Sequence, residues 1–429
     1  MKRIGGIQDV MARTLANLQG GMRNVPLRRL AARAEDALDK ALAERLDRQL
    51  ILPCADDPAE ELSRGAIQDR GQFLSRQDRW DELSELIRTA DAERQATTCA
   101  MSHAELYCFG ARADVVHATE EALADGVRPS IEGIEAFEEL LSEYPDDYPV
   151  AVTVALTHAD IGWAWRGGDW PHEIPERNIK LFETHFDRAR EILAPMVPAH
   201  PDSPLVASAL CTLLIGDPAP QNRLADDYER LIDLDPRNPR PMRALGYHLL
   251  PRWFGSYDAL ELEARRTAAR TGETWGNGAY TWVFMDALSV DPGASRIVDL
   301  DFFIDGMRDI LANRPDQHFA NLMAAYAAIE MDPARLPKDA PDIVRKTRVA
   351  VTETLDWILA EYLFELHPLV WAQAAIGPGA NTPLPRRSAL VRKGVVTARQ
   401  TIARHFAEEL LSGTTVAFSR HGLRLYPSL

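Results

Sequence analysis

One pattern recurs four times along this 429-residue chain. An amphipathic stretch with a helical period ends in an acidic or polar turn that contains a proline, and a second stretch rich in small residues follows. The four turn prolines are Pro145, Pro201, Pro236 and Pro315. The pattern predicts helical hairpins in tandem, because each hairpin leaves an apolar face that a neighbouring hairpin must cover.

The spacing of these prolines is uneven, with intervals of 56, 35 and 79 residues. Only the middle interval is close to the 34 residues of a tetratricopeptide repeat. Ten residues after each proline stands a small residue, as a close crossing of two helices requires. These residues are Ala155, Cys211, Gly246 and Ala325. We therefore predict an all-α fold, an irregular tetratricopeptide-like α-solenoid whose register is clearest at residues 224–250.

Three regions follow from this pattern: irregular helices over residues 1–125, the tetratricopeptide-like array over 130–335, and further helices over 340–429. We expect one helix over 346–366, and a helical stretch over 80–124 that breaks at Phe109-Gly110. Residues 376–386 hold three prolines and two glycines, which predicts a loop. Apolar residues at helical spacing from Val391 to Leu410 predict a basic final helix. Residues 415–418 and 423–426 predict a small β-hairpin at the C-terminus.

The net charge of −16 is unevenly distributed. Residues 1–50 hold ten basic against six acidic side chains, and residues 381–429 hold eight against two, so the region between them is strongly acidic. An acidic body argues against nucleic-acid binding, because it repels phosphates. The basic terminal helices leave open a peripheral contact with an anionic membrane surface.

Other features concern the compartment. Four cysteines without a CxxC pair predict a reduced protein and no zinc site. The N-terminus lacks the apolar run of a signal peptide, and the apolar stretches are far shorter than the roughly 20 residues that span a bilayer. We expect a cytoplasmic protein with no integral membrane segment. Five apolar residues form one face of an expected N-terminal helix, which either packs on its neighbour or lies on a membrane: Ile4, Ile7, Met11, Leu15 and Leu18.

Two inserts depart from the minimal repeat: residues 162–170, with the sequence GWAWRGGDW, and residues 249–257, with the sequence LLPRWFGSY. Over residues 155–285 the chain resembles an uncharacterised bacterial family with tetratricopeptide-like helices. That family carries an Ala-Trp-x-x-Arg-Gly segment and a Leu-Pro-Arg-Trp-Gly-Gly-Ser segment. Phe254 stands where the family usually has glycine. The resemblance implies the helical fold and carries over no activity.

The inserts supply the candidate binding residues. Trp offers a large rigid contact surface, and Arg can donate two hydrogen bonds to a carboxylate or phosphate. The alternative is that Trp163 and Trp253 fill gaps between hairpins while Arg166 and Arg252 bond to carbonyls at helix ends. On the usual geometry of the repeat, Arg243 and Tyr247 project into the concave groove.

A motif-free enzyme is a second hypothesis, with a site near His158, Asp160, Arg166 and His172. Their spacing is not that of a metal site, and the known nucleophile and phosphate-binding motifs are missing from the sequence. We therefore expect no metal and no cofactor. The favoured prediction is a helical-repeat scaffold or adaptor that binds a protein or peptide partner. The alternatives are the motif-free enzyme and an adaptor that contacts an anionic surface through its basic terminal helices.

Overall fold

The computed structural model describes residues 37–45, 48–55, 59–168, 172–377 and 385–427. It is 73 % helical and its strands form one small sheet near the C-terminus, which confirms the predicted all-α fold with a C-terminal hairpin. The chain forms two compact units: unit 1 comprises residues 1–58 and 289–429, and unit 2 comprises residues 59–288. None of the helices in the described ranges has the length and apolar character that crossing a bilayer requires. The expected N-terminal helix with its apolar face at residues 4–18 lies outside the described residues.

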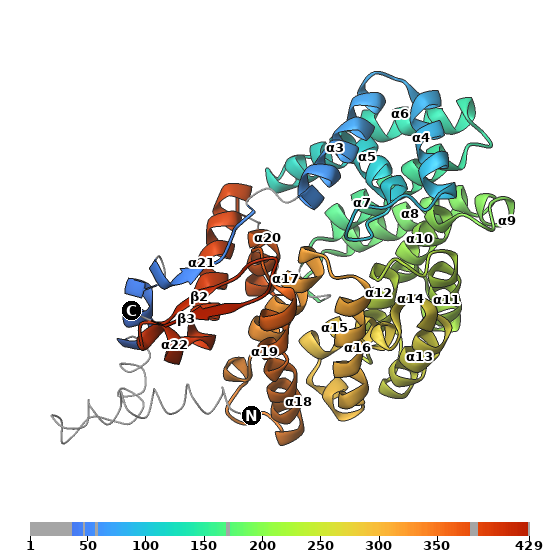
Figure 1. Cartoon of the computed structure of the whole chain (residues 1–429). Coiled ribbons are helices and arrows are strands. Elements are labelled where there is room, and N and C mark those ends of the chain that lie inside the picture. Colours follow the sequence, from blue (N-terminus) through green and yellow to red (C-terminus); the bar gives the residue numbers. More distant parts are fainter. Residues whose placement is uncertain (1–36, 46–47, 56–58, 169–171, 378–384, 428–429) are drawn as a thin grey trace. The chain divides into compact units, whose positions relative to one another are not determined.

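Unit 2 consists of helices joined by short turns, coloured from blue to yellow in Figure 1. Its elements are α3 (Ala59–Arg76), α4 (Trp80–Ala92), α5 (His103–Ala124), α6 (Glu132–Glu143), α7 (Tyr148–Arg166), α8 (Glu176–Leu193), α9 (Met196–Ala199), α10 (Pro204–Thr212), η1 (Leu213–Gly216), η2 (Pro220–Asn222), α11 (Leu224–Leu234), α12 (Arg240–His248), α13 (Tyr257–Arg270), α14 (Gly272–Trp275) and α15 (Gly278–Val290).

Helix α7 is central to the first half of unit 2. It is apolar on nearly every side, and residues 148–159 are all buried, because α8 and α5 both pack along it. Asp147 caps the helix by accepting a hydrogen bond from the Val150 amide at 3.0 Å. Gly167 ends it with a φ of 68°, a left-handed conformation that favours glycine.

The residues before the four marker prolines share one backbone conformation. The residue before each proline ends a helix with φ between −126° and −144° and ψ between 61° and 77°, because the proline ring excludes the helical region there. A polar residue one or two positions after the proline then caps the next helix or its first turn. These capping residues are Asp147, Ser203, Asn238 and Asp316. The predicted helix–turn–helix units are therefore present locally, whereas the tetratricopeptide register stays a prediction.

The small residue of each pattern is buried, as expected of a helix crossing. The closest approach is at Gly246, where a Cβ atom would lie 1.7 Å from the carbonyl oxygen of Val283. Helix α12 therefore contacts α15 backbone to backbone at this point. No residue larger than glycine fits without moving one of the two helices.

We expect Gly246→Ala to lower the free energy of unfolding by about 2 kcal/mol, because the added methyl group forces α12 away from α15. Gly65→Ala is the matched control, since Gly65 also lies inside a helix but a Cβ atom added there would meet no other atom within 4 Å. That control should be neutral or stabilising by about 0.5 kcal/mol. Urea unfolding followed by circular dichroism measures both, and equal effects would contradict the close crossing.

Unit 1 contains the remaining helices and the sheet, drawn in orange and red in Figure 1 apart from its N-terminal part. Residues 37–45 are also helical. The other elements are β1 (Leu50–Ile51), η3 (Pro292–Arg296), α16 (Leu300–Asn313), α17 (Gln317–Ala325), the π-helical η4 (Tyr326–Glu330), η5 (Pro333–Arg335), α18 (Asp342–Glu353), α19 (Leu355–Trp357), the π-helical η6 (Ile358–Tyr362), α20 (Pro368–Ile376), α21 (Arg387–His405), α22 (Ala407–Leu411), β2 (Thr415–Ala417) and β3 (Arg424–Tyr426).

The sheet has the order β1-β2-β3. Strands β2 and β3 form the predicted antiparallel hairpin, with Val416 opposite Leu425. Strand β1 pairs in parallel with β2, with Leu50 opposite Val416, and this pairing was not predicted. A two-residue strand has too little alternation to be recognised in a sequence.

Two helix predictions are wrong in detail. Helix α5 runs through Phe109-Gly110 without a break. Gly110 does not end the helix but allows α3 to approach closely, because a Cβ at Gly110 would lie 2.0 Å from the Gln68 carbonyl oxygen. The expected helix over 346–366 is interrupted after Glu353 and continues as short α19 and π-helical η6. The basic final helix is present as α21 and α22, which meet at Phe406. Most of the predicted loop, residues 378–384, lies outside the described residues.

Candidate functional site

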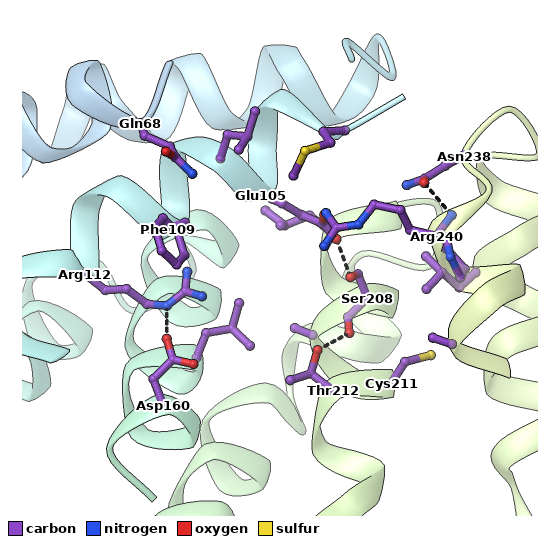
Figure 2. A pocket seen from close by; sticks show the side chains of 18 of the residues that line it. Gln68, Glu105, Phe109, Arg112, Asp160, Ser208, Cys211, Thr212, Asn238 and Arg240 are labelled. Atoms are coloured by element: carbon purple, nitrogen blue, oxygen red, sulfur yellow. Dashed lines mark hydrogen bonds and ion pairs between the residues drawn. The ribbon is translucent and has the colours of Figure 1, made fainter. Parts of the chain in front are cut away.

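Unit 2 contains a recess of about 450 Å³ bordered by α3, α5, α7, α10, α11 and α12. Its size is within the range of ligand-binding pockets. Figure 2 shows the side chains that surround it. Its apolar lining includes Leu106, Phe109, Leu156 and Leu205. Its polar lining includes Arg64, Gln68, Glu105, Arg112, Asp160, Ser208, Thr212, Asn238 and Arg240.

Arg112 on α5 is the most buried charged residue of the recess, with an exposed fraction of 9 %. Its Nε donates to Asp160 Oδ2 of α7 at 2.6 Å, and its guanidinium lies 5.3 Å from the centre of the Phe109 ring. Its Nη1 atom is buried and has no hydrogen-bond partner among the residues that the structure describes. A buried donor without an acceptor is costly, so this nitrogen marks the place where a ligand acceptor would be stabilised.

The opposite side of the recess carries Glu105, whose carboxylate accepts a hydrogen bond from the Ser208 hydroxyl of α10. Arg240, at the start of α12, places its Nη1 atom 3.6 Å from Glu105 Oε2. The Arg240 amide donates to Asn238 Oδ1 at 3.1 Å, which fixes the beginning of α12. These contacts connect α5, α10 and α12 across the recess (Figure 2).

Cys211 and Thr212 end α10 beside the recess. Burial raises the pKa of the Cys211 thiol well above its ordinary value. The sulfur therefore remains a neutral thiol, which is a poor nucleophile. Thr212 is exposed, and its hydroxyl donates to the Ser208 carbonyl oxygen at 3.0 Å.

A second hollow of about 250 Å³, which we call the α12 hollow, shares Arg240 and Ala244 with the recess. It contains the two residues predicted to face a groove. Arg243 donates two hydrogen bonds to Asp286, at 2.9 and 2.6 Å, and the Tyr247 ring lies 5.6 Å from that of Trp253. The structure thus places Arg243 and Tyr247 on one hollow surface, with the arginine bound to a carboxylate of α15.

The second insert forms the turn after α12. The Trp253 ring contacts Tyr247, His248 and Phe254, and the exposed Arg252 lies 5.6 Å above it. Gly255 is required because a Cβ there would lie 2.4 Å from the Leu249 carbonyl oxygen. Trp253 packs against this aromatic cluster, as the packing alternative expected, while Arg252 has an exposed side.

The first insert lies at the end of α7. The Trp163 ring packs edge-on against Phe182 of α8 at 5.3 Å, and the Arg166 guanidinium lies 5.4 Å from the centre of the Trp163 ring. Arg166 Nη1 also donates to the Gly167 carbonyl oxygen at 3.0 Å. Each insert therefore holds an arginine over a tryptophan whose other contacts are aromatic. Neither insert lines the recess.

The residues of the enzyme hypothesis are only partly brought together. Asp160 lines the recess, but His158 bonds to Glu138 Oε1 at 2.7 Å and to His185 Nδ1 at 2.9 Å. His172 is exposed in the turn before α8. Among the described residues no group of three histidine, cysteine or acidic side chains is arranged to hold a metal ion.

Sequence reasoning missed the main polar residues of the recess, namely Arg64, Glu105, Arg112 and Arg240. One hint was available for Arg112, which follows Ala104 and Cys108 at intervals of four residues. All three are buried on one face of α5, so a charged residue occupies an apolar helical stripe. The other three residues resemble ordinary surface charges, because the elements that surround the recess are far apart in the sequence.

No family model, curated protein or solved structure matches this chain. The resemblance of residues 155–285 to a bacterial tetratricopeptide-like family therefore stays a prediction.

Proposed function

We propose that this chain is a non-catalytic scaffold or adaptor and that its unit 2 binds a peptide segment of a protein partner in the recess. The observation that supports this most is the recess itself together with the adjoining α12 hollow. Arg240 and Ala244 line both, so the two hollows adjoin along α12. Two adjoining hollows suit an extended segment better than a single compact molecule.

The chemistry of the lining also favours binding. No histidine lines the recess in the described part of the chain, and its cysteine is a buried neutral thiol. Ser208, its serine, donates its hydroxyl proton to a carboxylate rather than to an imidazole. A carboxylate is a weaker base than an imidazole and is therefore less able to activate a serine nucleophile. The recess instead presents arginines, amides and apolar side chains, which are the groups of a recognition surface.

The test is the selection of peptides from a displayed random library on the purified full chain. We expect enriched peptides whose affinity falls at least tenfold in Thr212→Trp, because the indole of that variant fills the recess. Thr184→Trp on α8 is the matched control: Thr184 is also exposed and its hydroxyl also bonds to the carbonyl four residues earlier, at 2.8 Å.

The control variant should bind the selected peptides with unchanged affinity. Circular dichroism establishes that both variants keep the helical content of the parent. If no peptide is enriched, or if both variants bind equally well, the proposal is wrong.

A further inference from the structure

We propose that the recess recognises an acidic side chain of the bound peptide, with the Arg112 guanidinium as the main donor to its carboxylate. This inference rests on the proposed peptide-binding function and adds the chemical class of the anchor. It is carried by two arginine nitrogens, Arg112 Nη1 and Arg64 Nε, which are buried beside the same recess and have no hydrogen-bond partner among the described residues.

The orientation of Arg112 is fixed before a ligand arrives. Its Nε donates a hydrogen bond to Asp160 Oδ2 at 2.6 Å, and its guanidinium carbon lies 5.3 Å from the centre of the Phe109 ring. Because the Arg112 Nε is bound to Asp160, the two terminal nitrogens of the guanidinium group remain for another acceptor. Figure 2 shows the guanidinium directed from α5 into the recess. A prealigned guanidinium loses little side-chain entropy when it binds a carboxylate.

Arg64 lies on α3, the helix that crosses α5 beside the recess. Two glycines allow this crossing: a Cβ at Gly71 would lie 2.3 Å from the Tyr107 carbonyl oxygen, and one at Gly110 would lie 2.0 Å from that of Gln68. The close crossing places Arg64 and Gln68 of α3 around the same recess as Arg112. One Arg64 nitrogen, Nη1, is already bound to Glu61 at 3.0 Å, while Nε is the unpaired one.

The charges of the recess select a monoanion. Each of its three arginines already lies beside a carboxylate: Arg112 beside Asp160, Arg240 beside Glu105, and Arg64 beside Glu61, so the recess has little excess positive charge. Glu105 lies across from Arg112 (Figure 2), so a doubly charged phosphate would be repelled more strongly than a carboxylate.

The apolar lining fits the same anchor. Leu106, Leu156 and Phe109 surround the space next to Arg112 and can contact the methylene groups of an acidic side chain. A neutral amide of the same shape would accept a weaker hydrogen bond from the guanidinium than a carboxylate does, because hydrogen bonds between oppositely charged groups are the stronger ones. The recess therefore distinguishes glutamate from glutamine by charge and not by size.

The experiment compares two amidated, acetylated peptide pools of the form X-X-Glu-X-X and X-X-Gln-X-X, in which X is a mixture of uncharged residues. The change is made in the peptide, so the fold of the protein is not at risk. We expect the glutamate pool to bind the full chain at least tenfold more tightly than the glutamine pool, a difference of about 1.4 kcal/mol. Fluorescence polarisation of labelled pools measures both affinities.

Protein variants assign the effect to Arg112. In Arg112→Gln the two pools should bind with equal affinity, whereas Arg166→Gln, whose arginine lies over Trp163 and outside the recess, should keep the tenfold preference. If circular dichroism shows that Arg112→Gln does not fold, Arg112→Lys replaces it and should reduce the preference, because lysine lacks the planar fork.

The outcomes separate the two proposals. Equal binding of both pools to the parent chain, with both lost in Thr212→Trp, would overturn the carboxylate anchor and leave peptide binding in place. Tighter binding of a phosphoserine pool than of the glutamate pool would also overturn the anchor. Failure of all pools, or binding that is unaffected by Thr212→Trp, would overturn the proposed function itself.

Discussion

Replacing Asn321 with alanine should lower the free energy of unfolding by about 4 kcal/mol. This side chain of α17 has no exposed surface and makes four hydrogen bonds inside unit 1. Its Nδ2 donates to the carbonyl oxygens of Gln317 and Glu365, at 2.7 and 2.8 Å. Its Oδ1 accepts from the His367 amide at 3.0 Å and from the Trp371 indole at 2.8 Å.

The size of the effect follows from what the substitution leaves behind. Alanine removes the acceptor of two buried donors, and each buried donor without a partner costs about 1–3 kcal/mol. The segment between η6 and α20 would also lose two of its hydrogen bonds to α17, while those to Gln317 would remain. Unlike a cavity in an apolar core, this loss cannot be relieved by repacking of neighbouring side chains.

Asn178→Ala is the matched control for this measurement. Asn178 is partly buried and its Nδ2 makes one hydrogen bond, to the Trp165 carbonyl oxygen at 2.7 Å. Its loss should cost about 1 kcal/mol. Urea unfolding followed by circular dichroism measures both variants. A loss below about 1 kcal/mol for Asn321→Ala would show that the network does not stabilise unit 1.

Acidification from pH 7.5 to pH 4 should lower the stability of unit 2 by about 3 kcal/mol through two histidines. Burial and, to a smaller extent, the neighbouring His158 lower the pKa of His185 to about 4. Burial also lowers the pKa of His248 to about 4. A shift of this size corresponds to about 3 kcal/mol for each group, and partial exposure of both side chains reduces the sum.

The sign follows from proton uptake. Between pH 4 and about 6.5 the unfolded chain binds protons at these histidines while the folded chain does not, so stability rises with pH over this window. The contribution is complete above about pH 6.5 and is lost as the pH falls towards 4. The geometry agrees, because His158 Nδ1 and His185 Nδ1 lie 2.9 Å apart, and this hydrogen bond requires one of them to be unprotonated.

Variants isolate this effect from the carboxylates that titrate in the same range. The difference in unfolding free energy between pH 7.5 and pH 4 should shrink in His185→Asn and in His248→Asn. His117→Asn is the control, because the His117 side chain is 69 % exposed, and it should leave the difference unchanged. If all three variants behave like the parent chain, these histidines do not govern the acid sensitivity.

The local structure of the hairpins could be predicted because local rules control it. The proline restricts the residue before it, and a polar side chain shortly afterwards caps the next helix. The four residues that precede these prolines therefore share one conformation although the prolines are unevenly spaced. Gly246 was likewise predicted at a close crossing, and its contact with Val283 is present.

The recess could not be predicted in the same way. Its residues are contributed by six helices between α3 and α12, and an arginine on any one of them resembles a solvated surface charge in the sequence. The tryptophan inserts were more conspicuous in the sequence, yet Trp163 and Trp253 mainly contact other aromatic rings. Side chains that break a repeat pattern are conspicuous whether they bind a partner or fill a gap.

The sequence alone determined the helical class, the position of the hairpin turns and the C-terminal β-hairpin, because each depends on residues near one another in the chain. The tertiary structure decided what the charged residues do. The packing of α5 against α7 places Arg112 beside Asp160, where it is buried and one of its donors has no partner among the described residues. Apart from the apolar stripe of α5 that Arg112 interrupts, desolvation by distant helices leaves no mark in the sequence, since it depends on which elements meet in space.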